Sequence, residues 1–135
     1  MHRLFLDANV LFTAAHNPDG KAASLFDLLD LKHWELLSSA FAIAEACRNI
    51  VAKYPACAVR LESLIARLTV VGQPAPVAIG ISLPEKDQPI YVAALACRAT
   101  HLLTGDKQHF GRHMNRPRAT GGIVIQTVAE YLAGC

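Results

Sequence analysis

Hydrophobic residues recur along the chain with two different spacings, which together predict short buried strands alternating with helices. The apolar run at residues 3–6 is typical of a buried strand, and after Asp7 the spacing becomes helical. Residues 21–31 carry an apolar stripe at intervals of three and four, which predicts a second helix. Residues 34–37 then predict a second strand.

The rest of the chain continues this alternation, with proline and glycine at the breaks between elements. The elements that we expect there are a long helix capped by Ser38 or Ser39 and ended by Pro55, a helix over residues 56–68, a strand over 69–71, a loop over 72–84, a helix that begins at Asp87, strands over 101–104 and 123–126, and a helix over 127–132.

Apolar strands that alternate with helices favour an α/β fold. Each strand must be buried on two sides, so the sheet should be parallel with helices on both faces. The 135 residues are enough for one domain, spanning 1–135, with a hydrophobic core of its own. Sheets of this kind bind ligands at the carboxyl ends of their strands, so the residues that follow the strands are the first candidates for a site.

The composition narrows the class of protein. Hydrophobic residues make up 53% of the chain and charged residues 18%, which excludes a disordered protein. The apolar stretch at residues 4–12 is interrupted by Asp7 and Asn9 and is too short for a signal peptide or a membrane span, so we expect a cytoplasmic protein. The four cysteines include no CxxC pair, and we expect reduced thiols, with Cys47 and Cys97 in the core.

The formal net charge of +2 is too small to indicate nucleic-acid binding by itself, but its distribution is uneven. Residues 107–118 contain basic side chains and no acid. The basic residues of this run are Lys107, Arg112, Arg116 and Arg118. The run is either a solvated loop or a surface that contacts phosphates, and we take RNA binding by these four residues as our inference.

Four acidic residues stand where the predicted fold would bring them together. Asp7 directly follows the first strand, Asp106 follows the fourth, and Asp87 begins a helix. Glu45 is the only charged residue in residues 41–47, on a helix that starts from the end of the second strand. All four can therefore reach the same edge of the sheet.

Carboxylates brought together at a protein surface repel each other by about 1 to a few kcal/mol per close pair, so folding alone would not gather them. A hard divalent cation such as Mg²⁺ or Mn²⁺ would, because these ions take oxygen ligands and bind beside substrate phosphates. The chemistry that such a site predicts is phosphodiester hydrolysis, in which the metal activates water and offsets charge on phosphate oxygens.

Simpler interpretations exist for three of the acids. Asp87 and Asp106 could serve only as helix N-caps, a common role that contributes about 1 kcal/mol. Glu45 could be a solvated residue paired with Arg48, three positions later. Asp7 is harder to explain in this way, because an acid at the end of a buried strand needs a partner.

A zinc site built on histidine is a further alternative. His109 and His113 have the i, i+4 spacing of helical zinc ligands. Gly111 lies between them, however, and no third nitrogen or sulfur ligand is nearby in the sequence. We therefore do not expect zinc.

Three segments of the chain resemble the motifs of the PIN-domain family. Residues 6–11 have the sequence LDANVL, which is similar to the opening motif that carries the first active-site acid of that family. Glu45 falls where the family places a helical second acid, and residues 83–90 and 102–107 are similar to the segments with the third and fourth acids. All four acidic positions of the family are filled.

This resemblance implies a three-layer α/β/α sandwich around a parallel sheet of about five strands, in the order 3-2-1-4-5. It also implies a ribonuclease that cleaves single-stranded RNA with Mg²⁺ or Mn²⁺. The residues implied to bind the metal and act in catalysis are Asp7, Glu45, Asp87 and Asp106. Asn9 would support Asp7 without binding the metal, and Thr104 could hydrogen-bond a carboxylate or a ligand.

Many short members of the family resemble VapC-type toxins, which a small antitoxin neutralises and which usually dimerise. We therefore expect an antitoxin partner and a homodimer. The main alternative is a PIN-like module that binds RNA or protein without catalysis, and the presence of all four acids argues against it. A phosphoacceptor domain is a third interpretation, but such domains use a lysine after the last strand, and residues 123–127 contain none.

Overall fold

The computed structural model describes residues 1–31 and 34–135. Five parallel strands form one sheet in the order β3-β2-β1-β4-β5, which confirms the predicted order 3-2-1-4-5. The strands are β1 (His2–Leu6), β2 (Trp34–Ser39), β3 (Thr69–Val71), β4 (His101–Leu103) and β5 (Val124–Gln126). Because all strands are parallel, their carboxyl ends meet at one edge of the sheet.

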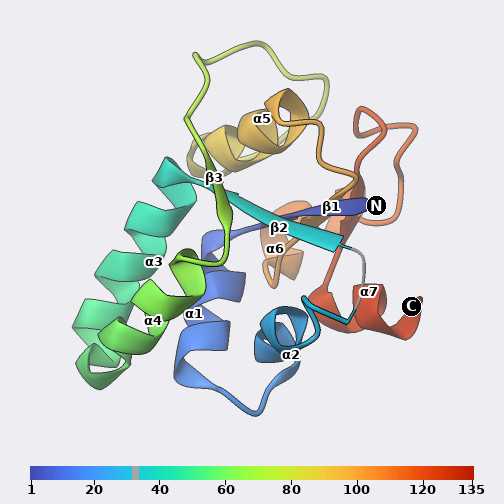
Figure 1. Ribbon diagram of the computed structural model, residues 1–135. Helices are drawn as coiled ribbons and strands as arrows, with labels where there is room; N and C mark the ends of the chain where they lie inside the picture. Colours follow the sequence, from blue (N-terminus) through green and yellow to red (C-terminus); the bar gives the residue numbers. More distant parts are fainter. Residues whose placement is uncertain (32–33) are drawn as a thin grey trace.

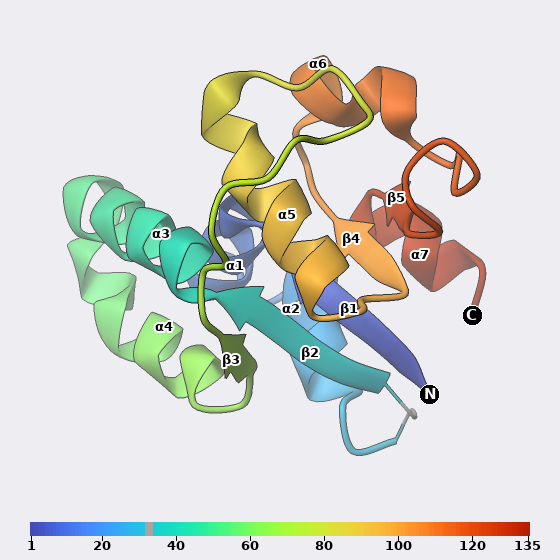
Figure 2. The same ribbon diagram turned by 90° about the horizontal axis from the view of Figure 1, so that it is seen from above.

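Helices cover both faces of this sheet, as expected. Figure 1 shows α5 on one face and α1, α2 and α7 on the other, and Figure 2 shows α3 and α4 beside each other at the end near β3. The helices are α1 (Ala8–His16), α2 (Lys21–Asp27), α3 (Ala40–Lys53), α4 (Ala58–Ile65), α5 (Gln88–Ala96), α6 (Lys107–Phe110) and α7 (Val128–Ala133), with short 3₁₀ turns η1 (Pro55–Cys57), η2 (Glu85–Asp87) and η3 (Gly111–His113). The predicted three-layer α/β/α architecture is confirmed.

The central strands are continuous apolar runs because helices cover them on both sides. Leu4, Phe5 and Leu6 of β1 are fully buried, and they pair with buried leucines, Leu36 and Leu37 of β2 and Leu102 and Leu103 of β4. At the end of β2 two buried serines turn the chain into α3. The Ser38 hydroxyl donates a hydrogen bond to the Leu6 carbonyl, and the Ser39 hydroxyl caps α3 by accepting one from a backbone N–H.

Several boundaries differ from the predictions. The helix expected over residues 21–31 ends at Asp27, and the helix expected over 56–68 is a 3₁₀ turn followed by α4. The basic run begins with α6 and η3 rather than as an irregular loop, because the Asp106 side chain caps α6 and the Phe110 ring is fully buried. Cys47 and Cys97 pack against the core but are only half-buried, and all four cysteines are free thiols. Among residues 1–31 and 34–135, no helix is both long and apolar enough to cross a membrane.

Candidate active site

Asp7 lies at the carboxyl end of β1 and is the N-cap of α1, where its side chain is 5% exposed. Its carboxylate accepts hydrogen bonds from the Ala8 N–H at 2.7 Å and from the Thr104 hydroxyl at 2.8 Å. Burial nevertheless raises the pKa of Asp7 to about 6, and the negative charges of Glu45 and Asp87 act in the same direction. The ionised form of Asp7 is therefore poorly stabilised by the protein alone.

Thr104, the residue after β4, connects Asp7 to Asp106. Its hydroxyl donates to Asp7 and accepts from the Asp106 N–H at 3.0 Å and from the Asn9 side-chain amide at 3.3 Å, which uses its full hydrogen-bonding capacity. The side-chain oxygen of Asn9, Oδ1, in turn accepts a hydrogen bond from the Gly105 N–H at 2.8 Å. These bonds fix the carboxylate of Asp7 and the turn that precedes Asp106 in one arrangement.

Asp87 ends η2 on the opposite side of the site, and 8% of its surface is exposed. It occupies the N-cap position of α5, but its side chain makes no capping hydrogen bond. The interpretation of Asp87 as a helix cap is therefore wrong. Burial raises the pKa of Asp87, and the nearby Asp106 charge adds to the rise while His109 opposes it. Asp87 is a second carboxylate whose ionised form is disfavoured by its surroundings.

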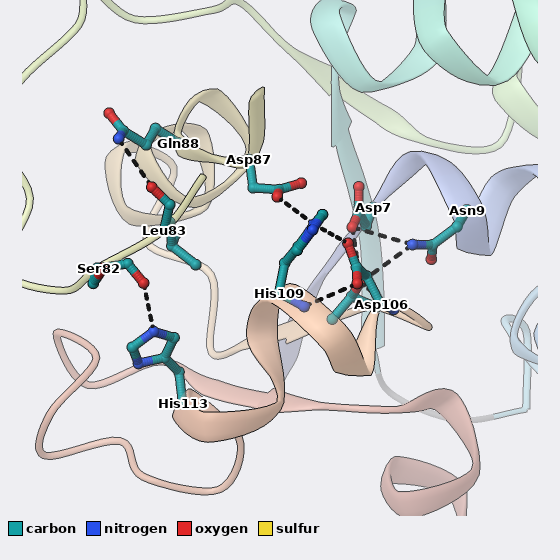
Figure 3. Close-up of polar contacts among 10 residues, drawn as sticks. Asp7, Asn9, Ser82, Leu83, Asp87, Gln88, Asp106, His109 and His113 are labelled. Atoms are coloured by element: carbon teal, nitrogen blue, oxygen red, sulfur yellow. Dashed lines mark hydrogen bonds and ion pairs between the residues drawn. The ribbon is translucent and has the colours of Figure 1, made fainter. Parts of the chain in front are cut away.

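Asp106 uses its two oxygens differently. Oδ1 accepts a hydrogen bond from the His109 N–H at 3.0 Å and so caps α6, whereas Oδ2 lies 2.8 Å from the His109 Nδ1 atom. The capping interpretation of Asp106 is correct for one oxygen only. The other oxygen faces the space between α6 and η2, where Asp87 lies (Figure 3).

His109 lies between the two aspartates, as Figure 3 shows. Its Nδ1 atom is 2.8 Å from Asp87 Oδ2 and 2.8 Å from Asp106 Oδ2, and the three atoms lie within 4.8 Å of one another. Within the described part of the chain, Asp87 Oδ2 and His109 Nδ1 are buried atoms that have no partner at hydrogen-bonding angles. The two side chains therefore approach closely without a well-formed hydrogen bond, and a cation would satisfy both atoms.

The sequence analysis considered His109 only together with His113, as a possible zinc ligand, and did not predict its contact with Asp87 and Asp106. His113, considered with it as a zinc ligand, is buried and donates from Nε2 to the Ser82 carbonyl at 2.8 Å, and its ring lies apart from the acids (Figure 3). The three-residue spacing of Asp106 and His109 could have indicated their contact, because an aspartate that caps a helix lies next to the side chain three residues later.

Glu45 lies on α3, half-buried, and approaches the cluster from the side of Asp7, because its charge contributes to the raised pKa of that residue. The alternative pairing with Arg48 is not present within 4.0 Å among the ion pairs of the described residues. The structure thus brings Asp87, Asp106 and His109 into contact and places Glu45 near Asp7 at the same edge.

The basic residues of the 107–118 run are all exposed. Lys107 is in α6, directly after Asp106, and Arg112 is in η3, while Arg116 and Arg118 lie between η3 and β5. Within the part of the chain described, none of the four forms an ion pair with a carboxylate within 4.0 Å. Their charges are therefore available to an external anion.

A scan against protein-family models and a search of curated proteins both gave no match to the sequence. A search of solved structures did give matches. VapBC2 from Rickettsia felis, in a crystal structure bound to a promoter DNA fragment, has a TM-score of 0.66 and 15% identity, covering 93% of this chain and 98% of that one.

Two further structures agree with the first. VapBC-1 from nontypeable Haemophilus influenzae has a TM-score of 0.60 and 19% identity, covering 94% of this chain and 98% of that one. VapC20 from Mycobacterium tuberculosis, described as a sarcin-ricin loop cleaving toxin, has a TM-score of 0.60 and 10% identity, covering 82% and 94%. At such identities a likeness establishes fold and not activity, and the chain accordingly has the VapC-type PIN fold.

Proposed function

We propose that this protein is a metal-dependent endoribonuclease that hydrolyses phosphodiester bonds of single-stranded RNA. The observation that carries the proposal is the gathering of carboxylates at the carboxyl edge of the sheet, where burial raises the pKa of both Asp7 and Asp87. Buried carboxylates without a cation oppose folding. A divalent cation bound at this edge accounts for their presence there.

The residues proposed to hold Mg²⁺ or Mn²⁺ are Asp7, Glu45, Asp87 and Asp106, an all-carboxylate set that suits a hard cation. The unpartnered Asp87 Oδ2 atom supports the fit, because it is buried and points toward Asp106 and His109. A bound metal would activate water and offset charge on the phosphate oxygens. Thr104 orients Asp7 by the hydrogen bond described above, and the Asn9 side-chain amide donates a longer one to Asp7 Oδ2 at 3.4 Å.

The basic run supplies contacts for the RNA backbone in this proposal. Lys107, Arg112, Arg116 and Arg118 are exposed cations close in sequence to Asp106, and side chains of this kind bind phosphates without reading bases. The description of VapC20 as a toxin that cleaves the sarcin-ricin loop supports RNA as the substrate class.

The proposal extends to the biological setting. The VapC-type fold supports a toxin that a small antitoxin neutralises in the cytoplasm, and the toxin is expected to form a homodimer. Induced expression of the chain in bacteria should arrest growth. An Asp106→Asn variant, which keeps an oxygen to cap α6 but loses the ligand charge, should not.

Cleavage of an end-labelled, single-stranded RNA oligonucleotide tests the activity. We expect products with Mg²⁺ or Mn²⁺, none in EDTA, and far fewer from the same RNA annealed into a duplex. The matched control is Asp19→Asn, which removes an exposed aspartate remote from the cluster in sequence. Undiminished cleavage in EDTA would overturn the metal-dependent mechanism, and RNA binding without cleavage at any metal concentration would favour the non-catalytic interaction module.

A further inference from the structure

We infer that His109 supplies a nitrogen ligand to the metal held by Asp87 and Asp106, and that the site therefore prefers Mn²⁺ to Mg²⁺. This inference rests on the proposed function only in requiring that a metal binds at this edge of the sheet. It adds a ligand of a different chemical kind to the four carboxylates. It holds whatever the substrate is.

The spacing of the three atoms carries the first step. In an octahedral site with bonds of about 2.1 Å, neighbouring ligand atoms are about 3 Å apart and opposite ones about 4.2 Å apart. The His109 Nδ1 atom lies 2.8 Å from each aspartate oxygen, and all three atoms lie within 4.8 Å of one another. The two distances from His109 Nδ1 therefore match those between neighbouring ligands of one metal, and the 4.8 Å limit keeps the two aspartate oxygens close enough to share it.

Two of the three atoms lack other partners. Asp87 Oδ2 and His109 Nδ1 have no hydrogen bond among the described residues, although both are buried. The Asp87 residue is more than nine-tenths buried, and its free oxygen points at the imidazole (Figure 3). A hydrogen-bonded histidine–aspartate pair would satisfy both atoms by itself, whereas this arrangement leaves both without a partner and close to Asp106 Oδ2.

The backbone holds the imidazole in this place. The His109 N–H donates to Asp106 Oδ1, so the residue that provides one carboxylate also fixes the position of the ring three residues later. The fully buried Phe110 next to His109 anchors α6 to the core. Side-chain exposures of 24% for His109 and 22% for Asp106 leave the site open to water and to a phosphate on one side.

The nitrogen ligand determines the metal preference. Mg²⁺ favours oxygen ligands and keeps most of its waters, whereas imidazole suits transition metals. A site with an imidazole should therefore bind Mn²⁺ more tightly than an all-carboxylate site does, with little benefit to Mg²⁺. His109→Asn separates the two effects, because it places an amide near the position of Nδ1 and so replaces nitrogen ligation by an oxygen.

The test is Mn²⁺ binding followed by electron paramagnetic resonance, which needs no catalytic turnover. Wild type with Mn²⁺ should show a nitrogen-14 coupling in electron spin echo spectra, and His109→Asn should not. The variant should bind Mn²⁺ about tenfold more weakly or worse, the size of loss typical when groups around a metal are removed. Its affinity for Mg²⁺, measured by competition, should change much less. His16→Asn is the control, since His16 stacks on Tyr54 at the end of α1, away from the acids.

The outcomes separate this inference from the proposed function. Mn²⁺ that binds wild type with no nitrogen coupling would overturn the His109 assignment and leave the nuclease proposal standing. Equal losses of Mn²⁺ and Mg²⁺ affinity in His109→Asn would also overturn it, because they indicate a purely structural role. If wild type binds neither metal, the proposed function fails together with the inference. The echo spectrum of wild type decides the question even if the variant does not fold.

Discussion

Replacing Asp7 by asparagine should abolish RNA cleavage and, in EDTA, make the protein more stable than wild type. Most substitutions of buried residues destabilise a protein, so this combination is unusual. It follows here because the Asp7 carboxylate is buried and its pKa is raised to about 6. Asparagine keeps the size and the cap on α1 but removes the charge that burial disfavours.

The magnitude comes from the pKa and the hydrogen bonds of Asp7. A pKa raised from 3.8 to about 6 corresponds to about 3 kcal/mol of destabilisation at neutral pH, at 1.36 kcal/mol for each pH unit. With its oxygen kept at the Ala8 N–H, asparagine places an NH2 group at the position of Oδ2, and this group cannot accept the hydrogen bond that the Thr104 hydroxyl donates there, which costs about 1 kcal/mol. The net gain is about 2 kcal/mol, or roughly 6 °C in Tm for a domain of this size.

The pH dependence has a definite sign. The folded pKa of Asp7 lies above its ordinary value of 3.8, so the folded protein binds more protons than the unfolded chain between about pH 4 and pH 6. The stability of wild type therefore falls as pH rises through this window. The advantage of the asparagine variant should be small near pH 4 and complete above about pH 7.

The assay is thermal unfolding by circular dichroism in EDTA at a series of pH values. Asp19→Asn, which changes an exposed turn residue, should show neither the gain nor its pH dependence. Added Mn²⁺ should raise the Tm of wild type more than that of Asp7→Asn, because a ligand that binds only the folded state stabilises it. An advantage over wild type that is no larger at pH 7 than at pH 4 would refute the energetic reasoning, and an active variant would remove Asp7 from the site.

Three other predictions follow from the structure. Asp87→Asn loses no helix cap and removes a buried charge that the Asp106 carboxylate repels, so in EDTA the variant should be more stable than wild type by about 1 kcal/mol. Added Mn²⁺ should raise its Tm less than that of wild type, and equal melting behaviour of the two proteins would exclude Asp87 from the site. Replacing Arg112, Arg116 and Arg118 by glutamine should weaken RNA binding and flatten its salt dependence, and an unchanged slope would show that these side chains do not contact RNA. Light scattering should give about twice 14.6 kDa, because apolar side chains on α3 and α4 are exposed; a monomer mass at all concentrations would contradict the homodimer.

The fold could be predicted because the residue types of the strands indicate that both faces of the sheet are buried. Strands β1, β2 and β4 are apolar on both faces, which only a covered parallel sheet allows, and Ser39 marks the start of α3. The prediction was least accurate where tertiary contacts decide. Residues 107–113 look irregular, with Gly111 in the middle, and become helical because Phe110 is drawn into the core and Asp106 caps the turn.

The candidate site was also predictable only in part, because some of its residues meet only through tertiary packing. Asp7 and Asp106 were recognisable because they follow strands, and their position is fixed by the sheet. The possible cap at Asp87 could not be dismissed from the sequence, because Pro89 lacks an N–H but Ile90, the next residue, still offers one. His109 was not predictable as a partner of Asp87, since these residues are 22 positions apart and meet only through the packing of α6 against η2.

The structure suggests why this site lies where β1 and β4 end side by side. One hydroxyl, that of Thr104, bonds to Asp7, Asn9 and Asp106 at once, so the two strand ends are held in a single register. That rigidity keeps the carboxylates together although burial and mutual repulsion disfavour their charged forms. The fully buried strands of the sheet stabilise the fold against this cost, and a cation at the edge would remove much of it. Metal binding and folding stability should therefore be coupled in this protein, with the carboxylates as the shared element.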